Sequence, residues 1–267
     1  MGEHQVAREV ELLTLGSDFG ANSYATLAEV NELAGILGLG PERRLLDLGS
    51  GQGWPGLYLA RQTGCTVVLT DVPYEGLATA ARRANREGLT SRASTLVARG
   101  QMLPLRPATF DIVIHTEVLC CLGPKLATLQ ATFRALVPGG RTAFTVIFPT
   151  PGLTAADTRR AIEAGPPNCG LRTSYPSLLG SAGFVEIEEH DLTAAYIATL
   201  VRKQEVAEQF ADGMIRMLGH QEYDEMQAER KLAVAATRDG LLRRSLFVAR
   251  RARRTETTKS AVERTWP

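Results

Sequence analysis

The sequence has no long apolar run and no excess of charge of either sign. No stretch approaches the ~18 consecutive apolar residues that a membrane-spanning helix needs. The first 14 residues are polar and charged, so they lack the apolar segment of a secretory signal. The 30 Lys and Arg nearly balance the 29 Asp and Glu, which removes any global attraction to nucleic acid or an anionic membrane. We therefore expect a cytoplasmic protein with no nucleic-acid partner and no membrane association.

Cysteine is scarce, with four residues in the chain. They are Cys65, Cys120, Cys121 and Cys169, and no C-x-x-C pair or His/Cys ligand spacing occurs among them. The adjacent residues Cys120 and Cys121 are poorly placed to hold one metal ion together. We therefore expect reduced thiols and no metal site.

One basic cluster lies near the C-terminus. It consists of Arg243, Arg244, Arg250, Arg251, Arg253 and Arg254. We interpret it as a solvent-exposed strand end followed by a flexible tail over residues 252–267.

The most informative stretch runs from Leu45 to Gly53. It reads as an apolar strand containing one acid, Asp47, followed by glycines at alternate positions and then a helix. Such a turn brings bare backbone and a helix N-terminus against a ligand, which indicates a nucleotide-like cofactor. Read from Gly51, the letters give G-x-G-x-x-G, and Asp71 lies 20 residues further on, as in the fingerprint of dinucleotide binding.

A second register begins at Asp47 and reads D-x-G-x-G-x-G. It resembles the first motif of the class I S-adenosylmethionine-dependent methyltransferases. In the dinucleotide register Asp47 has no function. Gly49 and Ser50 would also separate the strand from Gly51, the first glycine of that motif. In the second register every residue has a task, and Gly56 serves helix packing.

Strands and helices alternate along most of the chain, which predicts an α/β fold with a doubly wound, seven-stranded, mostly parallel sheet. We expect an N-terminal helical cover over residues 1–40, a core over 41–193 and 240–251, and a helical lid inserted over 194–239. A long connection over 149–172 contains one short helix. The predicted strands are 45–48, 66–70, 94–98, 110–115, 141–148, 185–190 and 244–249. The predicted helices are 5–15, 22–38, 55–62, 74–87, 125–136, 174–182, 194–218 and 222–237.

Further motifs decide between the two registers. An acid, Asp71, ends the second strand. A Leu-Pro segment (Met102–Leu105) precedes the fourth strand, and a Phe-Asp pair opens it (Phe110–Ile114). A Pro-Gly-Gly segment (Leu136–Gly140) precedes the fifth strand, and an Ala-Gly-Phe segment (Ala182–Phe184) precedes the sixth. Their order and spacing over about residues 40–192 resemble class I methyltransferases with a Rossmann-like fold. A dinucleotide dehydrogenase has no reason to carry this set.

The resemblance implies S-adenosyl-L-methionine as the cofactor and assigns residues to it. Gly49, Gly51 and Gly53, with Ser50 between them, let the backbone approach the methionyl part and ribose. Asp47 accepts from the cofactor ammonium, directly or through water; its alternative role is that of a structural turn carboxylate. Asp71 offers two acceptor oxygens to the ribose hydroxyls, with a helix N-cap as its alternative role.

The adenine end departs from the family pattern. Val72 packs on one face of the ring, and Met102 or Leu103 packs on the other. Where the family often has an acid for the adenine amino group, this chain has Arg99, which only donates. We expect Gly100 and Gln101 to supply the contact instead. Tyr24, in the N-terminal cover, reaches the cofactor carboxylate or is a core aromatic.

The helical insert, together with the two N-terminal helices, resembles the small-molecule branch of this family, as in sarcosine/dimethylglycine and antibiotic-sugar methyltransferases. In that branch a His often follows the fourth strand, where this chain has Cys121. His115 is either a base or substrate ligand, or a packed residue lining the cofactor. Glu117 either positions the acceptor or caps a turn. The stripe Phe210, Met214, Met217 and Leu218 is either helix core or an apolar substrate wall.

We therefore expect in-line methyl transfer to the oxygen, nitrogen or carbon of a small molecule by a monomer or homodimer. A methyltransferase of nucleic acid or protein is an alternative, but the chain has no Asn-Pro-Pro-Tyr-like base-flipping motif. A cofactor-binding protein without methyltransferase activity is the other alternative.

Overall fold

A single seven-stranded sheet organises the chain in the computed structural model, which describes residues 3–253. The strand order is β3-β2-β1-β4-β5-β7-β6. Only β7 runs antiparallel to its neighbours, β5 and β6, so the predicted mostly parallel sheet is confirmed. The strands are β1 Arg44–Leu48, β2 Thr66–Asp71, β3 Ala93–Val97, β4 Phe110–Thr116, β5 Leu136–Pro149, β6 Phe184–Asp191 and β7 Leu242–Arg251.

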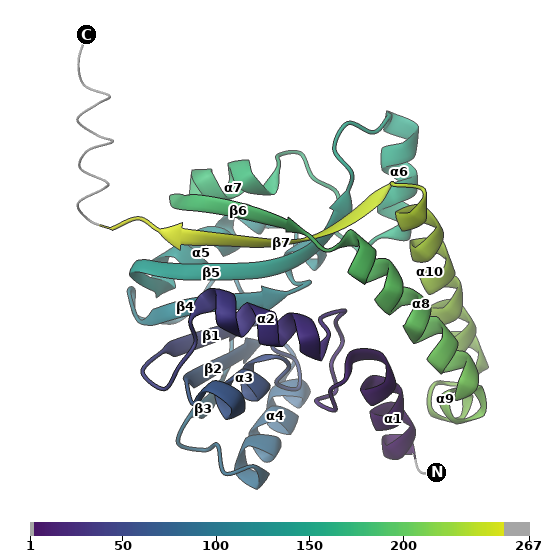
Figure 1. Ribbon diagram of the computed structural model, residues 1–267, viewed down its shortest axis with the longest axis horizontal. Coiled ribbons are helices and arrows are strands. Elements are labelled where there is room, and N and C mark those ends of the chain that lie inside the picture. The colour runs from purple at the N-terminus through teal and green to yellow at the C-terminus, as the bar shows by residue number, and fades with distance from the viewer. Residues whose placement is uncertain (1–2, 254–267) are drawn as a thin grey trace.

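Helices cover both faces of the sheet and the edge at which its parallel strands end. Figure 1 shows α1, α8, α9 and α10 gathered beyond that edge. Strand order reverses between β1 and β4, which is where a doubly wound sheet opens a ligand crevice. The helices are α1 Glu3–Leu15, α2 Leu27–Leu37, α3 Gly56–Thr63, α4 Tyr74–Arg86, α5 Lys125–Ala135, α6 Ala155–Ala164, α7 Tyr175–Ala182, α8 Thr193–Gln209, α9 Ala211–Leu218 and α10 His220–Arg238.

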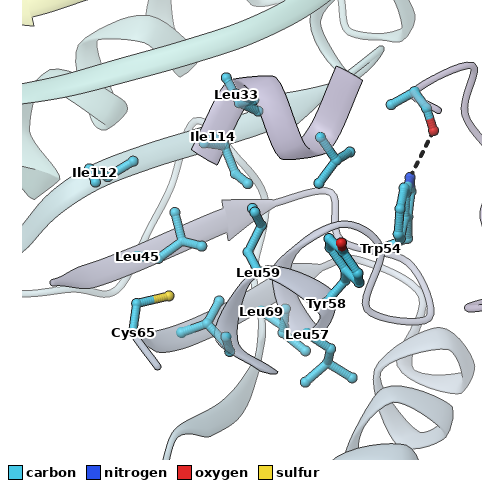
Figure 2. Packing of buried hydrophobic residues seen from close by; sticks show 14 of the residues in the cluster. Leu33, Leu45, Trp54, Leu57, Tyr58, Leu59, Cys65, Leu69, Ile112 and Ile114 are labelled. Atoms are coloured by element: carbon cyan, nitrogen blue, oxygen red, sulfur yellow. Dashed lines mark hydrogen bonds between the residues drawn. The ribbon is translucent and has the colours of Figure 1, made fainter. Parts of the chain in front are cut away.

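The core forms on both faces of β1, as expected for a strand inside a parallel sheet. Leu45 faces a cluster with α2, α3 and α4, and Leu46 faces a second cluster with α5 and α7. Figure 2 shows Leu45, Leu59 and Ile114 packed together in the first cluster. Asp47 is the only polar side chain between Leu45 and Leu48, and it is buried.

The helix predicted over residues 22–38 begins later, at Leu27. Thr26 caps it, because its hydroxyl accepts from the Glu29 amide (3.3 Å) while the Glu29 carboxylate accepts from the Thr26 amide (3.0 Å). Residues 22–26 are therefore free to run as a loop, and they carry Tyr24 away from the helix.

The helix predicted over residues 194–218 is two helices, α8 and α9, that meet at Phe210. Gly213 packs so closely on α1 that a Cβ there would lie 2.8 Å from Val6 Cγ2, so α9 turns toward α1. The fifth strand also begins earlier than predicted, because Leu136 already pairs with Phe110 before a register shift. The short helix expected between residues 149 and 172 is α6.

Candidate active site

The glycine loop joins β1 to α3 at the edge where strand order reverses. Gly49 has φ +74° and Gly51 has φ +51°, conformations that favour glycine. A side chain at Gly49 would also overlap Val118, whereas a Cβ at Gly51 would meet nothing within 4 Å. The loop is thus open to a ligand at Gly51, whereas the Val118 side chain fills the space next to Gly49.

Asp47 lies behind this loop. Its Oδ2 accepts from the Gly56 amide at 2.8 Å, and a Cβ at Gly56 would lie 2.6 Å from that oxygen. Gly56 is therefore a close-packing glycine, as the methyltransferase register predicts. Burial raises the pKa of Asp47 to about 8, and the hydrogen bond from the Gly56 amide, which lowers the pKa, offsets only part of this rise. With a side chain that is 1% exposed, Asp47 supports the loop, and its contact with the cofactor ammonium stays a prediction.

Asp71, at the end of β2, faces the open side of the loop. Its Oδ2 accepts from the Gly51 amide at 2.8 Å, and its Oδ1 accepts from the Val72 amide at 2.7 Å. A carboxylate has about four acceptor positions, so each oxygen retains capacity for a ligand hydroxyl. Asp71 and the glycine loop are thus brought together as expected.

An open cleft of about 440 Å³ lies beside Asp71. Val72 and Met102 line it and are 54% and 70% exposed, unusually high for large apolar side chains. Arg99 also lines it, and Val97 and Ala98 complete the wall. The cleft is flat and apolar, which fits a heteroaromatic ring, and it brings together two of the residues expected to hold adenine.

Gly100 and Gln101 follow Arg99 at this cleft. A Cβ at Gly100 would lie 3.1 Å from Leu48 Cδ2 and 3.2 Å from Thr128 Cγ2, so glycine lets this turn approach the strand end. Gln101 is half-buried. The role of both residues at adenine stays a prediction.

Tyr24 lies in the loop before α2, against α8 of the helical insert. Its ring packs edge-on to Tyr196 of α8, with 4.8 Å between centroids, and Lys203 Nζ lies 4.8 Å from its centroid. Its amide donates to Glu117 Oε2 at 3.2 Å. Burial raises the pKa of Tyr24. The ring is thus packed among aromatic and aliphatic groups of the insert, and its contact with the cofactor carboxylate stays a prediction.

His115 is fully buried in β4. Its ring stacks on Phe144, with 4.6 Å between centroids, and neither ring nitrogen has a hydrogen-bond partner. Burial lowers the pKa of His115 to about 3, so the ring is neutral. In this arrangement neither nitrogen reaches the crevice surface, and the catalytic role of His115 stays a prediction.

Glu117 follows β4 and enters a buried ion network. Its Oε1 accepts from Arg244 Nε and from Thr145 Oγ1, each at 2.8 Å, and Arg244 also binds Glu29 at 2.7 Å. Glu117 has φ +53°, an uncommon conformation for a residue with a side chain. Together with the Tyr24 amide on Oε2, three donors already occupy its carboxylate, which suits positioning better than proton transfer.

Arg244 corrects the interpretation of the C-terminal basic cluster as solvent-exposed. Its side chain is 0% exposed. Burial lowers its pKa, but the carboxylates of Glu117 and Glu29 outweigh burial and raise it. The signal was in the sequence, because Arg244 alternates with Leu246 and Val248 and therefore shares their inward face. Arg254 and the tail up to residue 267 lie outside the described residues.

The thiols of Cys120 and Cys121 meet where the chain leaves β4. Both lie against the Glu117 carbonyl, at 3.1 and 3.4 Å. The pKa of Cys121 is lowered because the Cys120 thiol donates to it and Lys125 lies nearby. Among residues 3–253, no group of three or more His, Cys, Asp or Glu has the arrangement of a metal site. Within the same residues, no helix is both long enough and apolar enough to cross a membrane.

Lys203 and Arg230 of the helical insert were not anticipated from the sequence. Both line a pocket of about 220 Å³ beneath the insert. Lysine and arginine are common on helices, so no local sequence pattern distinguished these two residues as part of a site.

A parallel sheet with this glycine loop, an acid at the end of β2 and an apolar cleft beside it defines a doubly wound domain built for an adenosine-containing cofactor. Residues 46–144 match the family model described as a methyltransferase domain. This match agrees with the resemblance of the motifs to the class I S-adenosylmethionine-dependent methyltransferases.

Curated relatives share part of the chain. Methyltransferase GfsG of Streptomyces halstedii is 32% identical over 158 residues, which is 56% of this chain and 55% of that protein. The chain spans about half the length of the first relatives it matches.

Solved structures share the fold over nearly the whole chain. Phosphoethanolamine N-methyltransferase 2 of Haemonchus contortus, in complex with phosphomonomethylethanolamine and S-adenosylhomocysteine, superposes with a TM-score of 0.79 at 18% identity. The match covers 95% of this chain and 59% of that one. The [4+2]-cyclase SpnF superposes with a TM-score of 0.68 at 21% identity, covering 95% of this chain and 98% of that one. At these identities the likeness concerns the fold.

Proposed function

We propose that this protein is an S-adenosylmethionine-dependent methyltransferase that acts on a small molecule. The observation that carries the proposal is the arrangement of Asp71 between the open Gly51 loop and the apolar cleft. A bare backbone, a carboxylate suited to a sugar and a ring-sized apolar surface then lie in the order in which methionine, ribose and adenine are joined. The match of residues 46–144 to a methyltransferase domain and the relatives named as methyltransferases support the proposal.

In this proposal the cofactor lies along the carboxyl edge of β1, β2 and β4. Gly49, Ser50, Gly51 and Gly53 form the surface for its methionyl part, and Asp71 accepts from its ribose hydroxyls. Val72 and Met102 enclose adenine, with Gly100 and Gln101 at its polar edge. Asp47 holds the loop in place by accepting a hydrogen bond from the Gly56 amide. It also contacts the ammonium group of the cofactor through a water molecule. The cofactor supplies a methyl group on a sulfonium, and the protein's task is to align the acceptor and exclude water.

The acceptor lies on the opposite side, under α8, α9 and α10, which we propose as the lid over residues 194–239. Residues 1–40 form the second part of the cover. Glu117 acts as a positioning residue, because its carboxylate holds the Tyr24 amide and Thr145. His115 borders the cofactor from within the sheet. The acceptor atom is oxygen, nitrogen or carbon, and the proposed assembly is a monomer or homodimer.

Titration calorimetry with S-adenosylhomocysteine tests the cofactor site. Asp71→Ala removes both ribose acceptors, so we expect affinity to fall by at least about tenfold, as for charged hydrogen bonds. Asp224→Ala, an exposed aspartate on α10, is the matched control and should bind as the wild type does. Absence of binding by the wild type, or equal binding by Asp71→Ala, would refute the proposal.

A cofactor-binding protein that does not transfer methyl groups is the second candidate. Two observations favour it: the His of the small-molecule branch is replaced by Cys121, and the Glu117 carboxylate is occupied by Arg244. The fold likeness to a protein named as a [4+2]-cyclase is a reminder that this fold hosts other chemistry. Binding of S-adenosylhomocysteine without labelled methyl transfer to a broad acceptor panel would select this candidate.

A further inference from the structure

A pocket of about 220 Å³ lies between the N-terminal cover and the helical insert, apart from the proposed cofactor cleft. α1 and the loop at residues 20–22 form one side, and α8, α9 and α10 form the other. Its lining includes Val10, Glu11, Lys203, Met214, Met217 and Arg230. The pocket is therefore assembled only when the two terminal parts of the chain come together.

Lys203 and Arg230 bring two positive charges to this pocket, and neither is in direct contact with a carboxylate of the described residues 3–253. Lys203 Nζ donates to the Ser23 carbonyl at 2.7 Å. Arg230 Nη1 donates to the Lys203 carbonyl at 3.3 Å and to Gln227 Oε1 at 3.4 Å. All these acceptors are neutral, and across residues 3–253 neither cation forms an ion pair with a carboxylate.

Glu11 is the acid that lines the pocket together with this pair, and its carboxylate is already engaged. Oε1 accepts from the Ser17 hydroxyl (2.6 Å) and the Phe19 amide (2.8 Å), and Oε2 accepts from the Gly20 amide (2.6 Å). Glu11 therefore fixes the loop at residues 17–20 and acts on Lys203 only from a distance, without a direct ion pair.

The energetic consequence is visible at Lys203. Burial, together with the charge of Arg230, lowers the pKa of Lys203 to about 8. Burial also lowers the pKa of Arg230. Two half-buried cations side by side repel each other, and an anion placed between them would remove this repulsion and supply charged hydrogen bonds.

Part of the remaining lining is apolar, beside the polar residues Glu11, Thr14 and Asn22. Val10 of α1 and Met214 and Met217 of α9 form this part, and methionine adapts to irregular ligand shapes. The pocket therefore has a cationic end and an apolar end, which matches a small acid with a hydrocarbon body.

We propose that this pocket binds the acceptor of the methyl transfer through an anionic group, a carboxylate or a phosphate, held by Lys203 and Arg230. This inference rests on the proposed function. Tyr24 connects the pocket to the reacting edge, because its ring lies under Lys203 while its amide binds Glu117 at the end of β4. An acceptor anchored here by its charged end extends its body past Tyr24 toward the glycine loop.

Calorimetry on the full chain tests the anion site without a cofactor, using hexanoate, hexanol and inorganic phosphate as probes. We expect hexanoate to bind more tightly than either of the others. Lys203→Gln and Arg230→Gln should each weaken hexanoate binding by about tenfold, the usual effect of losing a charged hydrogen bond. Lys231→Gln, an exposed neighbour of Arg230, removes the same charge and should have no effect.

Binding of S-adenosylhomocysteine to the same variants distinguishes the two proposals. Unchanged affinity for S-adenosylhomocysteine together with weakened hexanoate binding supports the acceptor site and also shows that the variants are folded. Weakened S-adenosylhomocysteine binding with unchanged hexanoate binding would assign the cations to the cofactor and overturn the inference. No hexanoate or phosphate binding by the wild type would also overturn it, whatever the cofactor does.

A methylation screen of acids against their neutral esters extends the test to turnover. We expect the acids to be methylated in preference, with Arg230→Gln raising KM for an acid more than it changes kcat. Methylation of esters alone would overturn the inference while leaving the proposed methyltransferase intact. An inactive but S-adenosylhomocysteine-binding protein would refute the inference, because the pocket would then have no acceptor to hold.

Discussion

The two sides of the proposed active site are built by different means. The cofactor side uses backbone amides and short side chains from neighbouring strand ends, such as Gly51 and Asp71, 20 residues apart. The acceptor side uses long charged side chains from distant segments, such as Glu117 and Arg244, 127 residues apart. The first arrangement is open and depends on loop conformation. The second is closed and depends on charges that only the complete fold can neutralise.

This difference predicts that the acceptor side is more vulnerable to removal of a single charge. Arg244→Met leaves the buried Glu117 carboxylate, and Glu29 beside it, without a cation. We expect a loss of about 3–5 kcal/mol in the free energy of unfolding, the usual cost of breaking a buried pair. Denaturant unfolding measures it.

Arg243→Met is the control for this prediction. Arg243 forms its ion pairs with Glu189 and Asp191 at the surface, so we expect a loss below about 1 kcal/mol. Equal effects of the two substitutions would show that the acceptor side is not held together by its buried charges.

On the cofactor side, we expect substitutions that disturb the backbone conformation of the glycine loop to reduce stability. Gly49→Ala adds both an unfavourable positive φ and an overlap with Val118, so we expect a loss of about 3 kcal/mol in stability. Gly51→Ala adds only the positive φ and should cost about 1 kcal/mol. Thermal unfolding of the two variants checks the difference. A Gly51→Ala variant as damaged as Gly49→Ala would contradict the open face assigned to Gly51.

The pH dependence of stability isolates Asp47. Its pKa is raised by burial to about 8, so the native state binds its proton more tightly than the unfolded chain. The contribution is fully present below the unfolded pKa of about 4, and it is lost as pH rises toward 8, with a slope of at most about 1.4 kcal/mol per pH unit.

Asp47→Asn should flatten this slope, because the amide keeps an oxygen for the Gly56 N–H and has no proton to lose. Unfolding measured between pH 4 and 8 tests this. Asp157→Asn, on the outer helix α6, serves as the control and should leave the slope unchanged. An identical slope in the wild type and Asp47→Asn would mean that Asp47 does not titrate in this window.

The smallest expected effect concerns adenine. Arg99→Asp restores the acid that the family often has here, and a new hydrogen bond to the adenine amino group should add about 1 kcal/mol to S-adenosylhomocysteine binding. Arg106→Asp makes the same charge change at an exposed position outside the cleft and should leave affinity unchanged. Weaker binding by Arg99→Asp would indicate that Arg99 itself contacts the cofactor.

The succession of strands and helices along the chain, and the meeting of Asp71 with the glycine loop, were largely predictable from the sequence. Glycines with positive φ and acids at strand ends are local requirements, so they leave local patterns such as Asp47 to Gly53. One boundary moved for a tertiary reason, because α9 packs at Gly213 against Val6 of α1. The later start of α2 follows instead from a local pattern, the Thr26–Glu29 capping box, which the predicted helix over 22–38 overlooked.

The acceptor side was much less predictable. A buried Arg differs from an exposed one only through partners elsewhere in the chain, and Glu117 gains its conformation from Arg244 and Thr145. Lys203 and Arg230 occupy ordinary helix positions, and only packing brings them into one pocket. Side-chain charge pairing across such separations has no periodic signature.

The Arg244 network also bears on the order in which the protein is made. Arg244 lies on β7, which inserts between β5 and β6, and it bonds to Glu29, 215 residues earlier. A nascent chain emerging from the ribosome therefore carries its glycine loop long before it carries the cation that Glu117 and Glu29 require. Because domains assemble as their segments become available, the cofactor side can condense during synthesis. The wall facing the acceptor is completed only when the last strand arrives.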